Sequence, residues 1–121
     1  TKRKILKKQN IILEGFDSIN YQTGRIFATA KDGTQIPISL VYRKDKFESH
    51  KNPLLILGYG SYGVISESTF NPYVISLLDR GFVYAIAHIR GGGELGAEWY
   101  LQGKLLNKKN TFTDFIDATE Y

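Results

Sequence analysis

Cysteine is absent from the 121-residue sequence, which excludes disulfides, thiol nucleophiles and cysteine-based metal sites. Long apolar runs are missing as well. No stretch approaches the roughly 20 residues that a transmembrane helix needs, and no charged-then-apolar signal segment opens the chain. These absences lead us to expect a cytoplasmic protein. The chain opens at Thr1 rather than at a methionine, which is compatible with a missing upstream segment.

Positive charge is concentrated at the N-terminus. The formal net charge is +4, five basic residues and no acidic one lie within the first ten positions, and the remaining residues sum to −1. A basic tail can bind phosphates or acidic membrane surfaces, but no nucleic-acid recognition motif accompanies this one. We therefore expect neither a nucleic-acid nor a membrane partner, and interpret residues 1–14 as a linker or an edge strand.

Residues 25–42 alternate apolar and polar side chains on either side of Asp32-Gly33. Asp-Gly between alternating runs is the preferred two-residue hairpin turn, in which both turn positions adopt positive φ. The pattern predicts an antiparallel hairpin. Pro37 lacks an N–H group, so its strand should lie near a sheet edge or direct that nitrogen away from the neighbouring strand.

A strand–helix–strand pattern follows the hairpin. The continuous apolar run at residues 53–57 is typical of a central strand buried on both faces. Asn71 and Pro72 predict the N-cap and first turn of a helix that Gly81 ends, and residues 82–89 form a second buried strand. The strands of such a unit are parallel, so the glycine-rich loops that follow them should meet at one edge of the sheet.

The C-terminal residues predict a last helix. Asn110 should cap it, and one face of the helix is expected to carry Phe112, Phe115, Ile116 and Thr119. A helix on such a sheet normally leads into another parallel strand, so the chain is interpreted as a fragment of a larger α/β domain.

The loop GYGSYG at residues 58–63 meets the G-x-G-x-x-G pattern of dinucleotide-binding proteins. That motif requires a helix to begin within it, whereas here Pro72 delays the helix. Arg90 would suit a 2′-phosphate, so weak binding of an NADP-type nucleotide is an alternative. Ser61 differs from a nucleophile elbow, since Tyr59 replaces the first glycine and no helix follows directly; it is interpreted as a turn serine.

Only His50 and His88 are available as general bases. His50 lies among charged residues and is expected to be solvated, whereas His88 is interpreted as a satisfied residue of a buried strand. A zinc site formed by His88, Glu94 and Glu98 lacks a recognised ligand spacing. We therefore expect no metal and no cofactor.

The combination of motifs is more specific than any single one. GYGSYG after a strand, a helix ending in SLLDRG, the strand FVYAIAHI, then RGGGELG and KKNTFTDF together resemble the catalytic domain of the prolyl oligopeptidase family of serine peptidases, in its oligopeptidase B branch. The resemblance covers roughly residues 15–121. It implies the N-terminal part of an α/β-hydrolase fold, incomplete here, with residues 1–14 as a linker or exit strand from a missing β-propeller.

The resemblance also implies roles for individual residues. Tyr59 matches the family tyrosine whose hydroxyl joins the oxyanion hole, where one such donor contributes about 3 kcal/mol. Tyr62 would lie near the pocket for the residue before the scissile bond. The loop after the second strand would shape the site, either by substrate contact or by an ion pair of Arg90 and Glu94 that holds the two loops together. Its members are Arg90, Gly91, Gly92, Gly93 and Glu94.

In this branch, the preference for Lys or Arg in the substrate relies on acidic residues, two of which follow GYGSYG. This sequence has Glu67 and Thr69 there, so one of the two carboxylates is kept. The family's nucleophile serine, Asp and His all follow the helix at which this chain ends. The resemblance therefore implies a parent serine oligopeptidase acting on short basic peptides, and predicts that these residues alone are inactive. A binding or self-assembly module, forming a homo-oligomer through exposed strand edges, is the alternative from another class.

Overall fold

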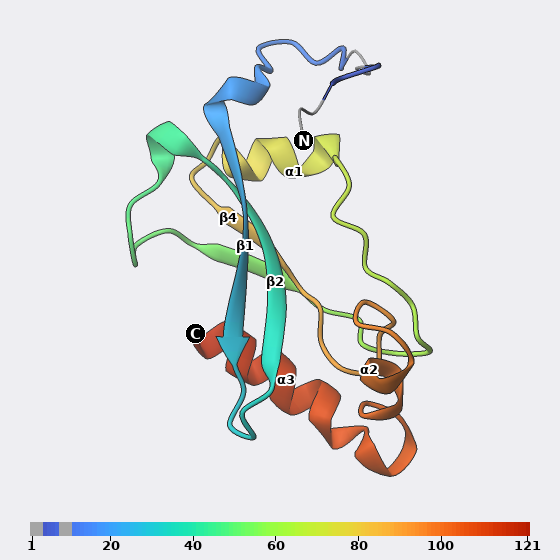
Figure 1. The fold of residues 1–121 in the computed structure, drawn as a ribbon. Helices are drawn as coiled ribbons and strands as arrows, with labels where there is room; N and C mark the ends of the chain where they lie inside the picture. Colours follow the sequence, from blue (N-terminus) through green and yellow to red (C-terminus); the bar gives the residue numbers. More distant parts are fainter. Residues whose placement is uncertain (1–3, 8–10) are drawn as a thin grey trace.

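The computed structural model describes residues 4–7 and 11–121. Its strands form one sheet in the order β1-β2-β4-β3, with helices against both faces (Figure 1). The strands are β1 Tyr21–Thr29, β2 Gln35–Arg43, β3 Leu54–Leu57 and β4 Val83–Ala87. The helices are α1 Pro72–Leu78, α2 Ala97–Leu101 and α3 Lys109–Glu120, with 3-10 turns at Ser18–Asn20, Lys44–Lys46 and Leu105–Asn107. The predicted mixture of a hairpin and an α/β unit is confirmed.

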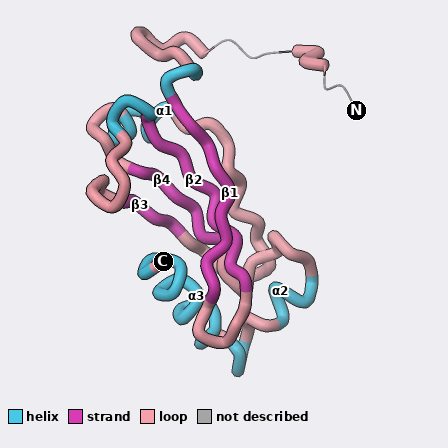
Figure 2. The backbone as a smooth tube through the Cα atoms, turned by 60° about the vertical axis from the view of Figure 1, so that its left-hand side comes forward, coloured by secondary structure: helices cyan, strands magenta, loops and turns pink. Residues whose placement is uncertain are grey.

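The segment before the sheet has no regular structure at residues 4–7 and 11–13, and it leads away from β1 (Figure 2). Residues 1–3 and 8–10, which belong to the predicted linker or exit strand, lie outside the described residues. No helix in the described part of the chain is long and apolar enough to cross a membrane.

The hairpin is confirmed, but the predicted turn is wrong. Ala30 and Thr34 pair through a backbone hydrogen bond of 2.8 Å, which leaves a three-residue loop at 31–33. Only Gly33 in this loop has a positive φ, +85°. Asp32 instead accepts the Thr34 N–H at 3.0 Å through its side chain. This Asx-type bond favours a three-residue loop with glycine at the left-handed position over a two-residue turn.

The βαβ unit is confirmed, since β3 and β4 are parallel neighbours joined through α1. Asn71 accepts the Tyr73 N–H at 3.0 Å as the helix N-cap, and Gly81 ends the helix with φ +90°. The strand β3 is not central, however, because β4 is its only partner in the described sheet. Leu54 and Leu57 are 45% and 48% exposed. An apolar run predicts a strand's burial but not which segment covers it, and here no described strand pairs with the outer edge.

Pro37 lies in the interior of the sheet, so the predicted edge placement is wrong. Its carbonyl accepts the His88 N–H at 2.9 Å, and paired residues in an antiparallel ladder exchange both bonds. The absent proline N–H would therefore have faced the His88 carbonyl. That carbonyl instead accepts the indole Nε1–H of Trp99 at 3.1 Å. A side-chain donor thus replaces the backbone donor that proline lacks.

The helix α3 lies against the sheet face opposite α1 and turns a partly polar side inward. Its buried residues are Thr111, Asp114, Asp117 and Ala118. The face that carries the predicted residues is mostly exposed in the described structure: Phe112 and Ile116 are 62% and 49% exposed, Thr119 is exposed, and of the four Phe115 packs on the core.

The polar partners of α3 account for this orientation. Asp114 pairs with the buried Arg90, and Asp117 accepts the Lys31 N–H at 2.9 Å. The predicted cap is wrong as well, because Lys108 occupies the N-cap position without a side-chain capping bond. Asn110 instead donates to the Gln102 carbonyl at 2.9 Å.

Candidate functional site

The loops that follow β3 and β4 meet at one edge of the sheet, as the parallel unit predicts. The Gly63 N–H donates to the Gly91 carbonyl at 3.0 Å, and the Gly93 N–H donates to the Val64 carbonyl at 3.2 Å. A third segment joins them, since the Gly91 N–H donates to the Trp99 carbonyl at 3.0 Å. Backbone bonds therefore fix the position of GYGSYG relative to RGGGELG.

Glycine is required where these backbones touch. A Cβ on Gly91 would lie 2.1 Å from the Gly60 oxygen, and one on Gly103 would lie 2.1 Å from the Gly91 nitrogen. A Cβ on Gly93 would lie 2.4 Å from the Gly63 oxygen. Real Cβ atoms do not approach so closely, so the glycines of all three segments are needed for the loops to pack.

The two tyrosines of GYGSYG point outward from this packed base. Tyr59 is 52% exposed and Tyr62 is 84% exposed. Tyr62 also has φ +54°, a left-handed conformation that costs a non-glycine residue of order 1 kcal/mol or more. Such conformations persist where the surroundings impose them, and cluster at ligand-binding sites. Both phenol groups are accessible to a bound molecule.

Arg90 does not pair with Glu94, so that predicted ion pair is wrong. The Arg90 guanidinium forms two hydrogen bonds with Asp114, Nε to Oδ2 at 2.8 Å and Nη2 to Oδ1 at 2.5 Å, and contacts Asp32 at 2.7 Å. Arg90 is 4% and Asp114 0% exposed. Hydrogen bonding to Asp114 raises the pKa of Arg90 further above its usual range. The guanidinium is therefore engaged in the protein interior, and substrate contact by Arg90 is not favoured.

Glu94 does hold the two loops together, through other partners. Its Oε1 accepts the Ser66 N–H at 3.0 Å and lies 3.5 Å from His88 Nδ1. Burial acts to raise the pKa of Glu94, but the adjacent His88 ring and the Ser66 hydrogen bond outweigh it and hold the pKa below its usual range. A Cβ on Gly92 would lie 2.1 Å from Glu94 Oε2, so this glycine makes room for the carboxylate.

His88 completes a buried polar network below the loops. Its Nε2 lies 2.8 Å from Ser39 Oγ, which also accepts a hydrogen bond from Arg25 Nη1 at 3.1 Å. The order serine, histidine, carboxylate matches a catalytic triad in residue type. Ser39 nevertheless sits in mid-strand, paired with Arg25 on one side and Ile86 on the other, where ladder bonds occupy the backbone N–H groups that an oxyanion hole would need. We interpret the network as structural.

The structure does not bring together the other groupings that the sequence left open as alternatives. Glu98 accepts a hydrogen bond from Gln102 instead of approaching His88, and the described residues contain no cluster of three His, Asp or Glu residues placed to hold a metal. The helix α1 begins far from GYGSYG, at the other end of the sheet (Figure 1). Its N–H groups therefore cannot bind a phosphate held by that loop, and the geometry does not favour dinucleotide binding.

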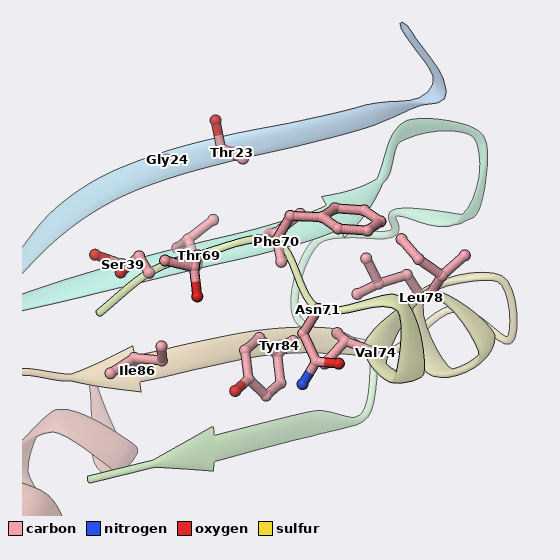
Figure 3. A pocket seen from close by; sticks show the side chains of 14 residues that line it. Thr23, Gly24, Ser39, Thr69, Phe70, Asn71, Val74, Leu78, Tyr84 and Ile86 are labelled. Carbon is pink, nitrogen blue, oxygen red and sulfur yellow. The ribbon is translucent and has the colours of Figure 1, made fainter. Parts of the chain in front are cut away.

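Glu67 and Thr69 lie in the exposed segment between GYGSYG and α1. Thr69, with Phe70, borders a cavity of about 390 Å³ between this segment, α1 and the sheet (Figure 3). Tyr84 and Ile86 line its floor, and the lining is mainly apolar. Glu67 does not line the cavity, so its carboxylate is free to face solvent.

Sequence reasoning missed Lys108, Thr111 and Asp114, which bind the loops to α3. Thr111 Oγ1 donates to the Arg90 carbonyl at 2.7 Å, and Lys108 Nζ lies 2.7 Å from the Gly60 carbonyl oxygen. The one available signal was the polar side chains at positions 108, 111 and 114, which recur every three residues and so share a helical face.

Comparison with known proteins identifies similar chains. A family model described as the prolyl oligopeptidase family matches residues 68–121. Dipeptidyl aminopeptidase BI from Pseudoxanthomonas mexicana is 54% identical over 120 residues, which cover 98% of this chain and 16% of that protein. Protease 2 from Moraxella lacunata is 41% identical over 106 residues, covering 88% of this chain and 15% of that protein. The chain thus spans about one sixth of the length of these relatives.

Solved structures of the same kind of protein are also similar to this chain. Oligopeptidase B from Leishmania major is 52% identical, with a TM-score of 0.84, over 88% of this chain and 15% of that one. The closed form of oligopeptidase B from Trypanosoma brucei with covalently bound antipain is 53% identical, with a TM-score of 0.83, over 88% and 15% of the two chains. The mixed sheet described above therefore corresponds to one part of each of those structures.

Proposed function

This chain belongs to the prolyl oligopeptidase family, and on that premise we propose that the whole protein is a serine peptidase that cleaves short peptides after Lys or Arg through an acyl-enzyme. The observation that carries the proposal is the 52% identity and TM-score of 0.84 with oligopeptidase B from Leishmania major. The chain covers only 15% of that protein, so the proposed activity is assigned to the whole protein and not to these 121 residues.

The role assigned to Tyr59 is that of an oxyanion donor. When a serine attacks the scissile carbonyl, negative charge develops on the carbonyl oxygen, and a fixed O–H donor stabilises it. Two features support this role: Tyr59 follows a β-strand at the edge where the two glycine loops meet, and its side chain is 52% exposed. A donor on a rigid loop needs little reorganisation during the reaction, which makes its contribution large.

Tyr62 and Glu67 are assigned to substrate binding. The exposed Tyr62 ring, three residues after Tyr59, offers an apolar face for the side chain before the scissile bond. Glu67 is an exposed carboxylate in the segment that follows, and it attracts the cationic end of Lys or Arg. An exposed charge acts mainly on binding and on the association rate, and its effect falls with salt.

We expect the 121-residue chain alone to be inactive. Both of its histidines are unsuited to act as a general base: His88 is 3% exposed and engaged with Ser39, and His50 lies exposed in a turn before β3. Without a nucleophile and base, an oxyanion donor has no intermediate to stabilise. Turnover by a protease-free preparation of this chain would contradict the expectation.

The test compares Tyr59→Phe with Tyr73→Phe in the whole protein, because Tyr73 is an exposed tyrosine on α1. Tyr59→Phe should lower kcat on a Lys- or Arg-containing peptide by about 100- to 1,000-fold, and Tyr73→Phe should leave it unchanged. Glu67→Gln should raise KM for the basic peptide but not for an alanine analogue. A wild-type enzyme with no preference for Lys or Arg would refute the specificity, and an unchanged kcat in Tyr59→Phe would refute the oxyanion role.

One observation favours a second candidate, self-association. The outer edge of β3 pairs with no described strand, and Leu54 and Leu57 beside it are about half exposed. Free strand edges favour the addition of a strand from another copy. Sedimentation of the chain across a range of concentrations tests this, and a monomer at every concentration would exclude it.

A further inference from the structure

Lys108 connects two segments that are far apart in the sequence. Its ammonium group donates to the Gly60 carbonyl at 2.7 Å and to Ser61 Oγ at 2.6 Å. These acceptors lie in the two residues that directly follow Tyr59. Hydrogen bonds from a charged donor are about twice as strong as neutral ones, so this contact is a strong restraint on the backbone after Tyr59.

The backbone that carries Lys108 is itself fixed. The residue precedes α3, its N–H donates to the Leu105 carbonyl at 3.1 Å, and its carbonyl accepts the Thr111 N–H at 3.2 Å. The helix is held against the sheet by the ion pair of Arg90 and Asp114. Lys108 therefore links the GYGSYG loop to α3, a helix whose position is fixed by packing.

The direction of the Gly60 carbonyl depends on the groups packed around it. Gly60 is buried, and its φ of +59° is one that glycine adopts readily, so the side chains that bond its carbonyl help to hold this conformation. The Thr111 hydroxyl reaches the Gly60 carbonyl only at 3.4 Å, which is long for a hydrogen bond between oxygens. Lys108 thus supplies the shorter of the two side-chain contacts to this carbonyl.

We propose that Lys108 is a positioning residue for the reaction: by holding the Gly60 carbonyl and Ser61, it aims the Tyr59 hydroxyl at the developing oxyanion. The inference rests on the proposed function of Tyr59. Because the Tyr59 side chain is half exposed, its direction depends chiefly on the backbone that carries it. A displacement of about 1 Å is enough to reduce a rate about 100-fold.

The test is a double-mutant cycle in the whole protein, with Lys108→Met, Tyr59→Phe and both together. Met keeps an unbranched apolar side chain but cannot donate. Lys108→Met should lower kcat by about 10- to 100-fold and leave KM within about twofold, because the contact acts on the transition state. In the Tyr59→Phe background the same substitution should have almost no further effect, since no hydroxyl is left to aim.

Three further variants separate positioning from a general structural role. Lys109→Met removes an adjacent exposed lysine and should leave kcat unchanged. Lys108→Arg keeps a charged donor and should restore part of kcat. Ser61→Ala removes one acceptor and leaves the bond to Gly60, so kcat should fall by only a few fold.

The outcomes are distinguishable. If Tyr59→Phe leaves kcat unchanged, the oxyanion role fails and the positioning role fails with it. If Tyr59→Phe lowers kcat but the effects of the two substitutions simply multiply, Lys108 does not act through Tyr59 and the inference is overturned. A Lys108→Met enzyme with normal kcat overturns it as well. A variant that does not fold is replaced by Lys108→Leu, which also cannot donate a hydrogen bond, and the same criteria apply to it.

Discussion

Asp114 in the middle of α3 and Arg90 after β4 form a two-pronged ion pair with both side chains buried, at 0% and 5% exposure. Asp114 Oδ2 also accepts the Arg90 backbone N–H at 3.0 Å. One carboxylate therefore satisfies the side chain and the backbone of the residue that begins the second glycine loop. Its removal leaves a guanidinium buried without its main partner.

We predict that Asp114→Asn destabilises the protein by about 3 to 5 kcal/mol, because breaking a buried pair from one side exposes the full desolvation cost of the remaining charge. The matched control is Asp45→Asn, which breaks the surface pair of Arg43 and Asp45 and should change stability little. Equilibrium unfolding in urea measures both. An equal loss of unfolding free energy in the two variants would contradict the prediction that burial makes the Arg90 pair more costly to break.

The close contact of the two loops leads to a second prediction. Gly91 has φ +99°, and its Cβ would meet the Gly60 oxygen at 2.1 Å, whereas Gly33 has φ +85° and open space around it. Ala at position 33 should cost about 1 kcal/mol of conformational strain. Ala at position 91 adds a clash between two backbones and should prevent the loops from packing. Hydrogen exchange at the Gly63 N–H, which bonds the Gly91 carbonyl, reports this directly.

Local sequence signals explain the parts of the fold that were predicted. Asn71 and Pro72 begin α1 and Gly81 ends it through short-range chemistry alone, so both ends of the helix could be located. The meeting of the two glycine loops followed from parallel strand order. The role proposed for Tyr59, by contrast, came from the family resemblance, since its position in GYGSYG alone does not indicate a catalytic donor.

The parts that were missed depend on contacts between distant residues. The apolar residues of α3 could be assigned to one face from their spacing, but Arg90 lies 24 positions from Asp114 and draws the polar side inward. Lys108 likewise reaches an acceptor 48 positions away. The three-residue spacing of the polar side chains indicates a shared helical face, but it does not identify their partners. The edge position of β3 was missed for a related reason, because an apolar run does not specify what covers it.

Acid should weaken a third contact, that of Asp32. Hydrogen bonds from Thr34 lower the pKa of Asp32 from 3.8 to about 2, and the bond from the Thr34 backbone N–H contributes most. A carboxyl whose pKa is depressed by folding stabilises the protein above its unfolded pKa, and this contribution is lost as the pH falls through the folded pKa. The wild type should therefore be more stable than Asp32→Asn at pH 5, with the difference shrinking between about pH 4 and pH 2. A constant difference would contradict the shift.

The hydrogen bond from Trp99 to the His88 carbonyl, at 3.1 Å, allows a test by rescue. Trp99→Phe keeps an aromatic ring but removes the donor, so a buried carbonyl loses its partner at a cost of about 1 to 3 kcal/mol. Pro37→Ala restores a backbone N–H facing the same carbonyl. In the wild type this N–H meets a carbonyl that is already paired, and the lost rigidity of proline makes the change neutral or slightly destabilising.

In the Trp99→Phe background, the new N–H has a carbonyl to pair, so Pro37→Ala should recover stability. The predicted coupling between the two substitutions is about 0.5 to 1.5 kcal/mol, measured by a double-mutant cycle of unfolding free energies. The unfolding free-energy changes of independent substitutions add to within about 0.5 kcal/mol. Additivity of Trp99→Phe and Pro37→Ala would contradict the proposed exchange of donors. A measured coupling would explain how β2, with a strand on either side, accepts a proline. The indole of Trp99 in α2 donates to the His88 carbonyl in place of the N–H that Pro37 lacks.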